Sequence, residues 1–341
     1  VPKLQKNSVV VKIKALGINP VDAKNVFGDK FPSMQIFDSG AKYIVKNSIP
    51  GFDFSGIVHE AAEDGKYKVG DKVYGTVPPF VGTCCQYQRA PLDQIQEMPK
   101  SLDFAEAASL PLTGLTCLQS LRGVDKDSRV LVIGASGGTG HFAVPYCKHH
   151  LQASKVVGIC SQSNKQWVTS LGADHVIPYN DEDWKTQLED FVKANGPFTT
   201  VLDTVTSAAP GDNAESYENI LRSSNQGSKL LEGKYLRLGG PTSSWFAAGV
   251  KRVAGINLFS RGSELFWIRF PKSSDELAEL NDAVDNKGIK THVSDKMECN
   301  EENLKKAFEM LFSRRTKGKI VLTIPDEDEN EQTSTSEQQT S

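Results

Sequence analysis

The sequence predicts an α/β protein in which a small β-barrel precedes a doubly wound parallel sheet. Two observations carry this prediction. Short segments rich in β-branched residues and punctuated by glycine fill the first third of the chain, as is typical of small barrels. From residue 129 onward, continuous apolar strands alternate with helix-like segments. This alternation indicates a parallel sheet with helices on both faces.

The bulk composition narrows the class of protein. The 341 residues predict about two domains, and 38% hydrophobic with 24% charged residues is typical of a globular protein. A net charge of −3 provides no electrostatic footprint for DNA or RNA. No apolar run approaches about 18 residues, so we expect no membrane span. We expect a cytoplasmic protein, or an organellar one if a targeting peptide preceding Val1 has been removed.

Cysteine usage indicates a reducing compartment. In a chain of this length, six cysteines without a CxxC pair predict separate core or surface thiols rather than a disulfide framework. They are Cys84, Cys85, Cys117, Cys147, Cys160 and Cys299.

The barrel segments come first along the chain. Segment 8–18 predicts a strand pair or one long bent strand, and segments 55–62 and 70–77 have similar patterns with Gly-Asp turn signals between them. Residues 103–123 then carry apolar residues at helical spacing. Asp103 with Glu106 three positions later makes a capping-box pattern at the start of that helix.

The alternating region follows. Its predicted strands are 129–134, 155–160, 174–179, 199–205 and 234–240, and its predicted helices lie near 138–149, 164–171, 182–194 and 213–222. The C-terminal part predicts strand 264–270, helices 273–288 and 301–313, and strand 319–324. The remaining residues are acidic and rich in Ser, Thr and Gln, which predicts a disordered tail.

A glycine-rich turn follows the first parallel strand. Gly134, Gly137 and Gly140 stand in a GxxGxxG register with Gly138 beside them. Between a strand and a helix, such glycines let the backbone approach a pyrophosphate while N–H groups at the helix start point toward it. The alternative is a helix that packs closely on its strand and needs glycine for clearance. We favour a dinucleotide site.

The end of the second strand bears on which dinucleotide would bind. A site for NAD has an acid there, about 20 residues after the loop, to hold the ribose 2′-OH. This chain has no acid there and instead has Ser161, Ser163 and Lys165, which suit a 2′-phosphate and therefore NADPH. Lys165 could also be an ordinary solvated lysine at a helix start. Tyr179, ending the third strand, could flank the phosphate or the adenine.

Several motifs together resemble the medium-chain dehydrogenase/reductase superfamily. The chain is most similar to its zinc-free quinone oxidoreductase branch, near the plastid alkenal and enone reductases and the reticulon-interacting and fungal NADPH reductases. The motifs run in the family's order and span residues 8 to 324. They are 16-LGINPVDAK-24, 50-PGFDFSGIV-58, 68-KVGDKVYG-75, 107-AASLPLTGLT-116, 134-GASGGTG-140, 171-LGADHVIPY-179, 201-VLDTV-205 and 317-KGKIVL-322.

The resemblance implies a domain layout. It implies a GroES-like β-barrel catalytic domain over residues 1–118 and an inserted Rossmann domain over 119–272. Residues 273–324 would return to the catalytic domain, and 325–341 would form the tail. The active cleft would lie between the two domains.

The residues at the family's metal positions predict that zinc is absent. Zinc-containing members hold the metal with a Cys and a His-Glu pair in the first domain. The corresponding residues here are Asn19, Phe52 and Asp53. A phenyl ring cannot ligate, and amide and carboxylate oxygens alone make a poor zinc site.

The resemblance also implies roles for individual residues. Asn19, a catalytic candidate with Lys24, would lie near the nicotinamide and its ribose, or would only form the turn before Pro20. Lys24 would hydrogen-bond a substrate carbonyl, stabilise its negative charge and supply a proton, although it could also be a surface lysine. Thr116 would contact the nicotinamide side of the cofactor, or be an ordinary helix-interior threonine.

The remaining implied contacts surround the cofactor. Gly137, Gly138, Thr139 and Gly140 would hold the pyrophosphate, and Val205, Gly239 and Gly240 would line the nicotinamide cleft. We expect Asp203 to be structural, capping the turn that follows its strand.

These observations predict an NADPH-dependent reductase of quinones or α,β-unsaturated carbonyls. Two alternatives stay open, namely an NADPH-binding scaffold with little turnover and a zinc-independent alcohol or polyketide-type enoyl reductase. An apolar strand at 264–270 predicts a homodimer, because pairing with its copy would cover an exposed edge. Segments 28–50 and 206–233 are longer than compact family members need.

Overall fold

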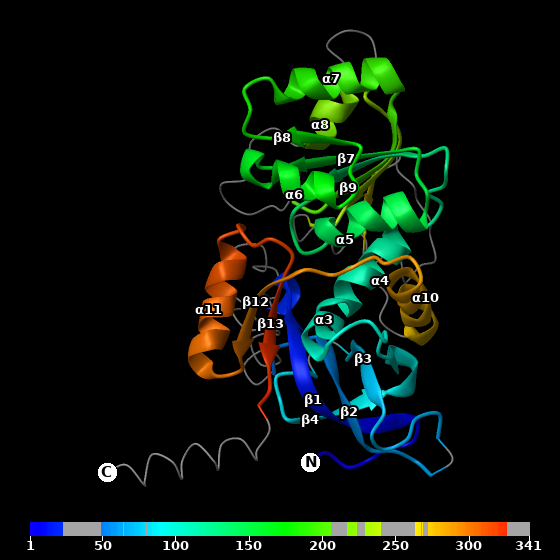
Figure 1. Ribbon diagram of the computed structural model, residues 1–341, viewed down its shortest axis with the longest axis vertical. Coiled ribbons are helices and arrows are strands. Elements are labelled where there is room, and N and C mark those ends of the chain that lie inside the picture. Colours follow the sequence, from blue (N-terminus) through cyan, green and yellow to red (C-terminus); the bar gives the residue numbers. More distant parts are fainter. Residues whose placement is uncertain are drawn as a thin grey trace, which may run out of the picture.

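The computed structural model describes residues 1–22, 49–63, 65–78, 81–205, 217–223, 229–239, 263–266, 268 and 272–325. Lys24, Gly240, and most of segments 28–50 and 206–233 lie outside the described residues, as does the tail after residue 325. Figure 1 shows two lobes, each built around one sheet. In the described part, no helix is long and apolar enough to cross a membrane.

The first sheet forms the lower lobe of Figure 1. Its path is β12-β13-β1-β2-β3-β5, and β4 pairs with β1. The strands are β1 (Ser8–Ile18), β2 (Asp53–Glu60), β3 (Lys72–Thr76), β4 (Tyr87–Pro91), β5 (Ile95–Glu97), β12 (Val293–Glu298) and β13 (Lys319–Thr323). β1 is one long strand, bent by register shifts at Val10/Val11 and Ile13/Ala15. The bent-strand alternative for segment 8–18 is therefore correct.

Three strands of this sheet were not predicted, and each carries a weak pattern. β4 and β5 are short, and β12 reads VSDKME with most of its side chains half-exposed or exposed. β12 pairs in parallel with β13. Its place in the sheet therefore depends on a strand further along the chain rather than on its own hydrophobicity.

The predicted helix 103–123 is two helices. α3 (Phe104–Ser109) begins with the predicted capping box: Asp103 Oδ1 accepts from Glu106 N at 2.8 Å, and Glu106 Oε2 accepts from Asp103 N at 2.9 Å. α4 (Pro111–Ser120) starts anew at Pro111, because proline has no N–H and favours a first helical turn. The break leaves the N–H of Leu112 free to bond outside the helix.

The second sheet has the strand order β11-β10-β9-β6-β7-β8, with parallel pairing throughout the described ladders. Its strands are β6 (Arg129–Ile133), β7 (Lys155–Cys160), β8 (His175–Pro178), β9 (Phe198–Asp203), β10 (Leu231–Arg237) and β11 (Ser263–Leu265). In chain order this is the 6-5-4-1-2-3 arrangement of a Rossmann sheet, which reverses between β6 and β9. The predicted fold class is confirmed.

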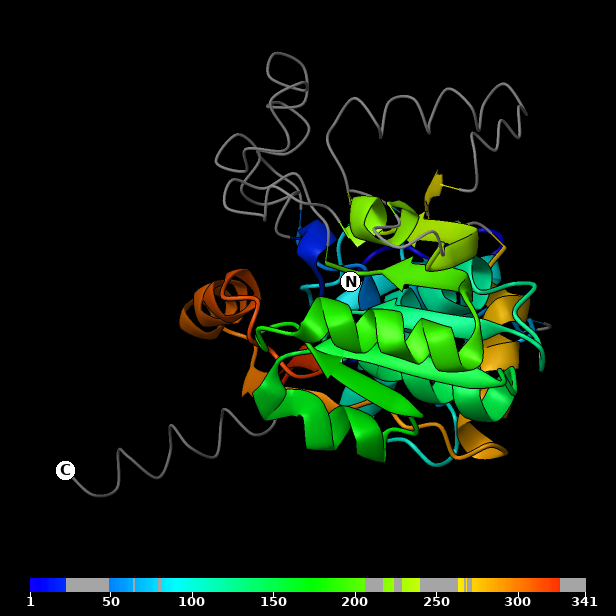
Figure 2. The same cartoon turned by 90° about the horizontal axis from the view of Figure 1, so that it is seen from above.

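Helices cover both faces of this sheet, as the view from above shows (Figure 2). They are α5 (Gly140–Pro145) continued by a π-helical segment (Tyr146–His150), α6 (Lys165–Ser170), α7 (Trp184–Asn195) and α8 (Tyr217–Arg222). The predicted strand 264–270 is described as a strand only to Leu265.

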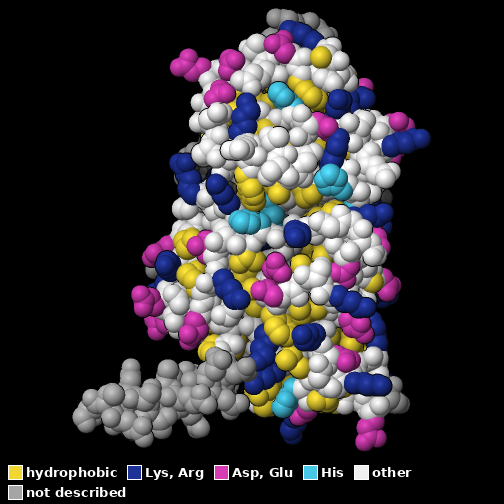
Figure 3. Space-filling view, in the orientation of Figure 1, with side chains coloured by type: hydrophobic (Ala, Val, Ile, Leu, Met, Phe, Trp, Pro, Cys, Tyr) yellow, Lys and Arg dark blue, Asp and Glu magenta, His cyan; other side chains and the backbone are white. Residues whose placement is uncertain are grey.

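The C-terminal residues return to the first sheet. α10 (Ser274–Asp285) packs against α4. Asn281 Oδ1 of α10 accepts a hydrogen bond from the hydroxyl of Tyr74 at 2.7 Å. α11 (Glu301–Phe312) packs on β13. In the space-filling view, acidic and basic side chains are interspersed over this face, with histidine and apolar side chains at the waist between the lobes (Figure 3).

Candidate functional site

The glycine turn lies where the order of the second sheet reverses. Gly134 follows β6 with φ +78°, and a Cβ there would lie 2.4 Å from Thr204 Oγ1 and 2.5 Å from Val205 Cγ2. A Cβ at Gly140 would lie 2.1 Å from the carbonyl oxygen of Gly134. Both glycines are therefore required by close packing, and the turn meets the segment that follows β9 at the position where such folds bind dinucleotides.

The first turn of α5 carries no side-chain cap, since Thr139 makes no capping hydrogen bond. The uncapped start of a helix is a general site for a phosphate group. A Cβ at Gly137 or Gly138 would come no closer than 3.4 Å to any neighbour. These two glycines are thus not required by packing, which is the behaviour expected where a ligand approaches the backbone.

His141 holds the glycine turn through the carbonyl of Gly137, a role that the sequence did not reveal. Its Nδ1 donates to the carbonyl of Gly137 at 3.1 Å, because its Nε2 accepts from His292 N at 3.1 Å and so carries no proton. Burial lowers the pKa of His141 to about 4, which keeps the ring neutral at pH 7. The ring also stacks on Trp167, with centroids 6.3 Å apart.

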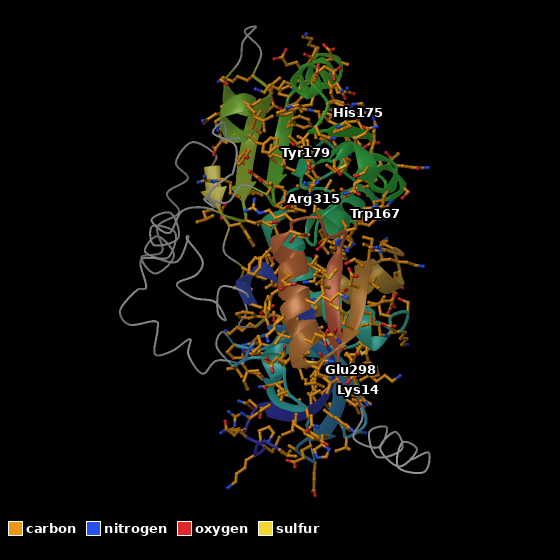
Figure 4. All side chains as sticks on the ribbon, turned by 90° about the vertical axis from the view of Figure 1, so that its left-hand side faces the viewer. Lys14, Trp167, His175, Tyr179, Glu298 and Arg315 are labelled. Atoms are coloured by element: carbon orange, nitrogen blue, oxygen red, sulfur yellow. The ribbon has the colours of Figure 1, made fainter. Side chains whose placement is uncertain are left out.

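The proposed 2′-phosphate residues gather at one edge of the sheet. Cys160 of β7 lies beside Pro178 of β8, so Ser161 and Tyr179 are neighbours. The hydroxyls of Ser161 and Ser163 are 3.0 Å apart, and Lys165 begins α6. Figure 4 shows Tyr179 on the same side of the molecule as Trp167 of α6.

The segment after β9 lies against the glycine turn. Asp203 is structural as predicted: its Oδ1 accepts from Val205 N at 2.9 Å and its Oδ2 from Tyr235 OH at 2.5 Å. Val205 thereby lies against Gly134. Gly239 is half-buried two residues after β10.

α4 packs against the other side of the turn. The hydroxyl of Thr113 donates to the carbonyl of Gly138 at 3.2 Å, and the thiol of Cys117 lies 3.6 Å from the carbonyl of Thr139. Thr116 lies between these two residues in sequence and is 8% exposed. It is therefore close to the turn, with little of its side chain open.

A buried polar cluster lies beside the turn, built from Asn19, Asp53 and Lys319. Asn19 Nδ2 donates to Asp53 Oδ2 at 2.9 Å, and Lys319 Nζ donates to Asn19 Oδ1. Lys319 Nζ is also 3.6 Å from Asp53 Oδ2. The three side chains are 2%, 0% and 4% exposed, so the amide of Asn19 is held between an ammonium and a carboxylate.

Two further contacts complete this cluster. The N–H of Leu112, freed by the break before α4, donates to Asp53 Oδ1 at 2.8 Å. Asp22 Oδ2 accepts from Asn19 N at 2.7 Å, whereas its buried Oδ1 has no partner among the described residues.

Burial governs the charges of the cluster. Burial, with a smaller contribution from the Asp53 carboxylate, raises the pKa of Asp22 to about 8. Burial also raises the pKa of Asp53 and lowers that of Lys319, while their mutual attraction opposes both shifts. A single buried cation stabilises one carboxylate far better than two. Near pH 7 we therefore assign an ion pair to Lys319 and Asp53, and a proton to Asp22.

Lys319 links this cluster to the glycine turn. A Cβ at Gly138 would lie 3.4 Å from Lys319 Cδ, and Gly318 N donates to the carbonyl of Ser136 at 3.1 Å. The lysine stem thus lies along the turn while its ammonium reaches Asn19. The site therefore joins a phosphate-type loop and a buried ion pair from the two lobes.

Two protein-family models match this chain. Residues 5–114 match the family described as "Alcohol dehydrogenase GroES-like domain", and residues 171–322 match "Zinc-binding dehydrogenase". The chain is 30% identical to the mitochondrial NAD(P)H oxidoreductase RTN4IP1 of Danio rerio, over 93% of this chain and 84% of that protein. The chain belongs to the medium-chain dehydrogenase/reductase superfamily.

Other relatives match over shorter stretches. The Arabidopsis thaliana NADPH-dependent alkenal/one oxidoreductase is 33% identical over 53% of this chain, and the alignment covers 47% of that enzyme. The alignment with human RTN4IP1 likewise covers 52% of that protein. The structure of the Coxiella burnetii quinone oxidoreductase superposes with a TM-score of 0.69 at 26% identity, over 95% of this chain and 92% of the other. The chain thus spans about half the length of several of the curated relatives it matches, and two of the proteins it resembles are named for alkenal/one or quinone oxidoreduction.

The residues at the superfamily's zinc position do not fit the metal. The oxygen of Asn19 accepts from Lys319, Asp53 is paired with the same ammonium, and Phe52 offers no donor. No group of three or more His, Cys, Asp or Glu side chains within the described ranges could hold a metal ion. The glycine turn instead fits the pyrophosphate of a dinucleotide, because the start of α5 has no side-chain cap and a Cβ at Gly137 would meet only the carbonyl oxygen of Gly134, at 3.4 Å.

The sequence missed the ion pair. Val205 lies against Gly134, Thr116 is next to Cys117 on the helix that packs on the turn, and Asn19 is linked to the turn through Lys319. The catalytic prediction for Lys24 lies outside the described residues. Lys319 was missed although a lysine opening the apolar segment KIVLT was a signal, since buried lysines in strands require a partner.

Proposed function

We propose that this chain is an NADPH-dependent, metal-independent reductase of quinones or α,β-unsaturated carbonyls. The observation that carries the proposal is the glycine turn lying against a buried Lys319–Asp53 pair. A phosphate-type loop indicates a dinucleotide, and the buried ion pair holds Asn19 in a fixed position beside that loop without a metal.

The proposal of NADPH rather than NADH rests on the residues that follow the carboxyl ends of β7 and β8. Ser161, Ser163 and Lys165 offer two hydroxyls and an ammonium where an NAD site has a carboxylate. A dianionic 2′-phosphate is favoured by such donors, whereas a carboxylate would repel it. Tyr179 flanks the same edge with its ring partly exposed.

The bound dinucleotide supplies the hydride. The chain's own residues orient the reactants and tune the charge around them. Asn19 is fixed by Lys319 and Asp53 beside the glycine turn. Negative charge developing on a substrate oxygen needs a donor that reaches this oxygen, and Lys319, which is 4% exposed and paired with Asp53, does not supply one. Lys24 follows Asp22 closely in sequence and is proposed to contact that oxygen.

The proposed substrate class agrees with the names of two relatives, an alkenal/one oxidoreductase and a quinone oxidoreductase. A substrate panel tests the proposal: absorbance at 340 nm is followed with NADPH and a series of quinones, enones, saturated aldehydes and alcohols. We expect oxidation of NADPH with quinones or enones. Binding of NADPH without turnover on any acceptor would instead favour a scaffold.

A further inference from the structure

Three cysteines, two of them adjacent and the third more than 200 residues away in sequence, meet at one pocket. Cys84, Cys85 and Cys299 line a cavity of about 390 Å³, together with Asn300, Leu304 and Ile324. The sulfurs of Cys84 and Cys299 are 3.3 Å apart although 215 residues separate them. Figure 4 labels Glu298 at the nearby end of β12 and Lys14 of β1, two strands between which β13 lies in the sheet. All six cysteines are free, as expected, but Cys84 and Cys299 are in contact rather than scattered.

The backbones of both cysteines are held in place. Cys84 N donates to the carbonyl of Pro50 at 3.0 Å, and Cys299 N donates to the carbonyl of Thr323 at 2.8 Å. A disulfide has an S–S length of about 2.0 Å. The two sulfurs, 3.3 Å apart, therefore have about 1.3 Å to close before a bond forms.

The two thiols differ in reactivity. Either sulfur can donate to the other; with the S–H of Cys299 as the donor, this hydrogen bond lowers the pKa of Cys84 and raises that of Cys299. Burial raises the pKa of Cys85 to about 11. Since the thiolate is the reactive form, Cys84 is the nucleophile of the group, and Cys299 lies where a resolving thiol would be.

We propose that Cys84 and Cys299 form a reversible dithiol site that is oxidised by small hydroperoxides entering this pocket. The Cys84 thiolate attacks one peroxide oxygen; the O–O bond breaks, Cys84 becomes a sulfenic acid, and the other oxygen leaves as an alcohol or water. The sulfur of Cys299 then attacks the sulfenic sulfur, forming the S–S bond and releasing water. Two thiols lose two electrons and the hydroperoxide gains them.

The site is also connected to the buried ion pair. Thr83, which precedes Cys84, donates its hydroxyl to the carbonyl of Asp53 at 3.2 Å. A disulfide would tether this loop to the end of β12, and thereby to β13 and Lys319. The thiol site is nevertheless independent of the proposed cofactor chemistry, so failure of either proposal leaves the other testable.

Peptide mapping of the full chain tests the proposal. The reduced protein is exposed to hydrogen peroxide, remaining thiols are blocked with N-ethylmaleimide, and a non-reducing digest is analysed by mass spectrometry. We expect one cross-linked species joining the Cys84 and Cys299 peptides, about 2 Da lighter than the two thiol peptides combined. It should disappear after treatment with dithiothreitol.

Three variants assign the bond. Cys85→Ser is the matched control and should give the same cross-link, because its neighbour supplies the reacting sulfur. Cys299→Ser should give no cross-link and should instead accumulate a sulfenic acid on Cys84 that dimedone traps. Cys84→Ser should show neither product. An unmodified Cys84 in the wild type, or a cross-link that requires Cys85, would overturn the proposal.

Discussion

Lys319 determines the charge of the candidate site. Its ammonium neutralises Asp53 and fixes Asn19, and all three side chains are nearly inaccessible to water. The pairing could not be predicted from sequence, because Asn19 and Lys319 are 300 residues apart. The strand that begins at Lys319 could be predicted, whereas the destination of its side chain depends on how the first and last strands meet.

Removing the ammonium should destabilise the protein. Lys319→Met leaves the carboxylate of Asp53 buried without its cation, and we expect a loss of about 3 kcal/mol in the free energy of unfolding. Urea denaturation at pH 7 measures this loss. The double variant Lys319→Met with Asp53→Asn should recover much of it, because no buried charge is left. A single variant as stable as the wild type would contradict the assigned ion pair.

Asp22 should make stability depend on pH. In the unfolded chain this carboxyl ionises near pH 4, but in the folded chain its pKa is about 8. The folded state therefore binds an extra proton between these values, so stability should fall as pH rises from about 4 to about 8 and should then level off.

The variant Asp22→Asn isolates this contribution. Its free energy of unfolding should fall less steeply than that of the wild type between pH 5 and 8, as thermal or urea denaturation at several pH values would show. Glu63→Gln changes an exposed acid and should leave the wild-type slope intact. Identical slopes in all three proteins would disprove the protonated Asp22.

Lys165 should discriminate between cofactors. Lys165→Met removes the ammonium expected at the 2′-phosphate, so the KM for NADPH should rise about tenfold or more while that for NADH changes little. Lys193→Met, on the exposed part of α7, is the control. An equal rise in KM for both cofactors would show that Lys165 does not read the phosphate.

Local sequence signals predicted some helices and strands of this chain and missed others. The capping box at Asp103 and the parallel strands were predictable, because each depends on residues close in sequence. β12 was missed because its alternating polar residues depend on pairing with β13. The predicted single helix at 103–123 failed because Pro111 can begin a helix as well as interrupt one.

Alanine substitutions at two glycines of the turn should distinguish a role in packing from a role in cofactor binding. Gly140→Ala should lower the melting temperature and prevent dinucleotide binding, since its Cβ would lie 2.1 Å from a backbone oxygen. Gly137→Ala has its nearest neighbour at 3.4 Å, so we expect a near-normal melting temperature but weaker NADPH binding. Thermal melts with and without NADPH distinguish the two effects. Normal binding by Gly137→Ala would place the pyrophosphate elsewhere.

At the scale of the whole molecule, the two sheets meet at the cluster around Lys319. The chain leaves the first sheet, builds the Rossmann sheet and returns through β12 and β13. The boundaries at residues 118/119 and 272/273 remain predictions. Within the described ranges β11 is the edge of the second sheet, and we propose that it pairs with its copy in a homodimer. Light scattering should give twice the mass of one chain, and a monomer mass would contradict the pairing.

We propose that this chain is a reductase that uses NADPH and needs no metal. Its most direct test is the steady-state rate of NADPH oxidation by the wild-type chain with one quinone and one enone, repeated with NADH and after dialysis against a chelator. We expect turnover with at least one acceptor, a clearly higher kcat/KM for NADPH than for NADH, and no loss of rate after chelation. Equal use of both cofactors, or a rate that returns only when zinc is added, would contradict it.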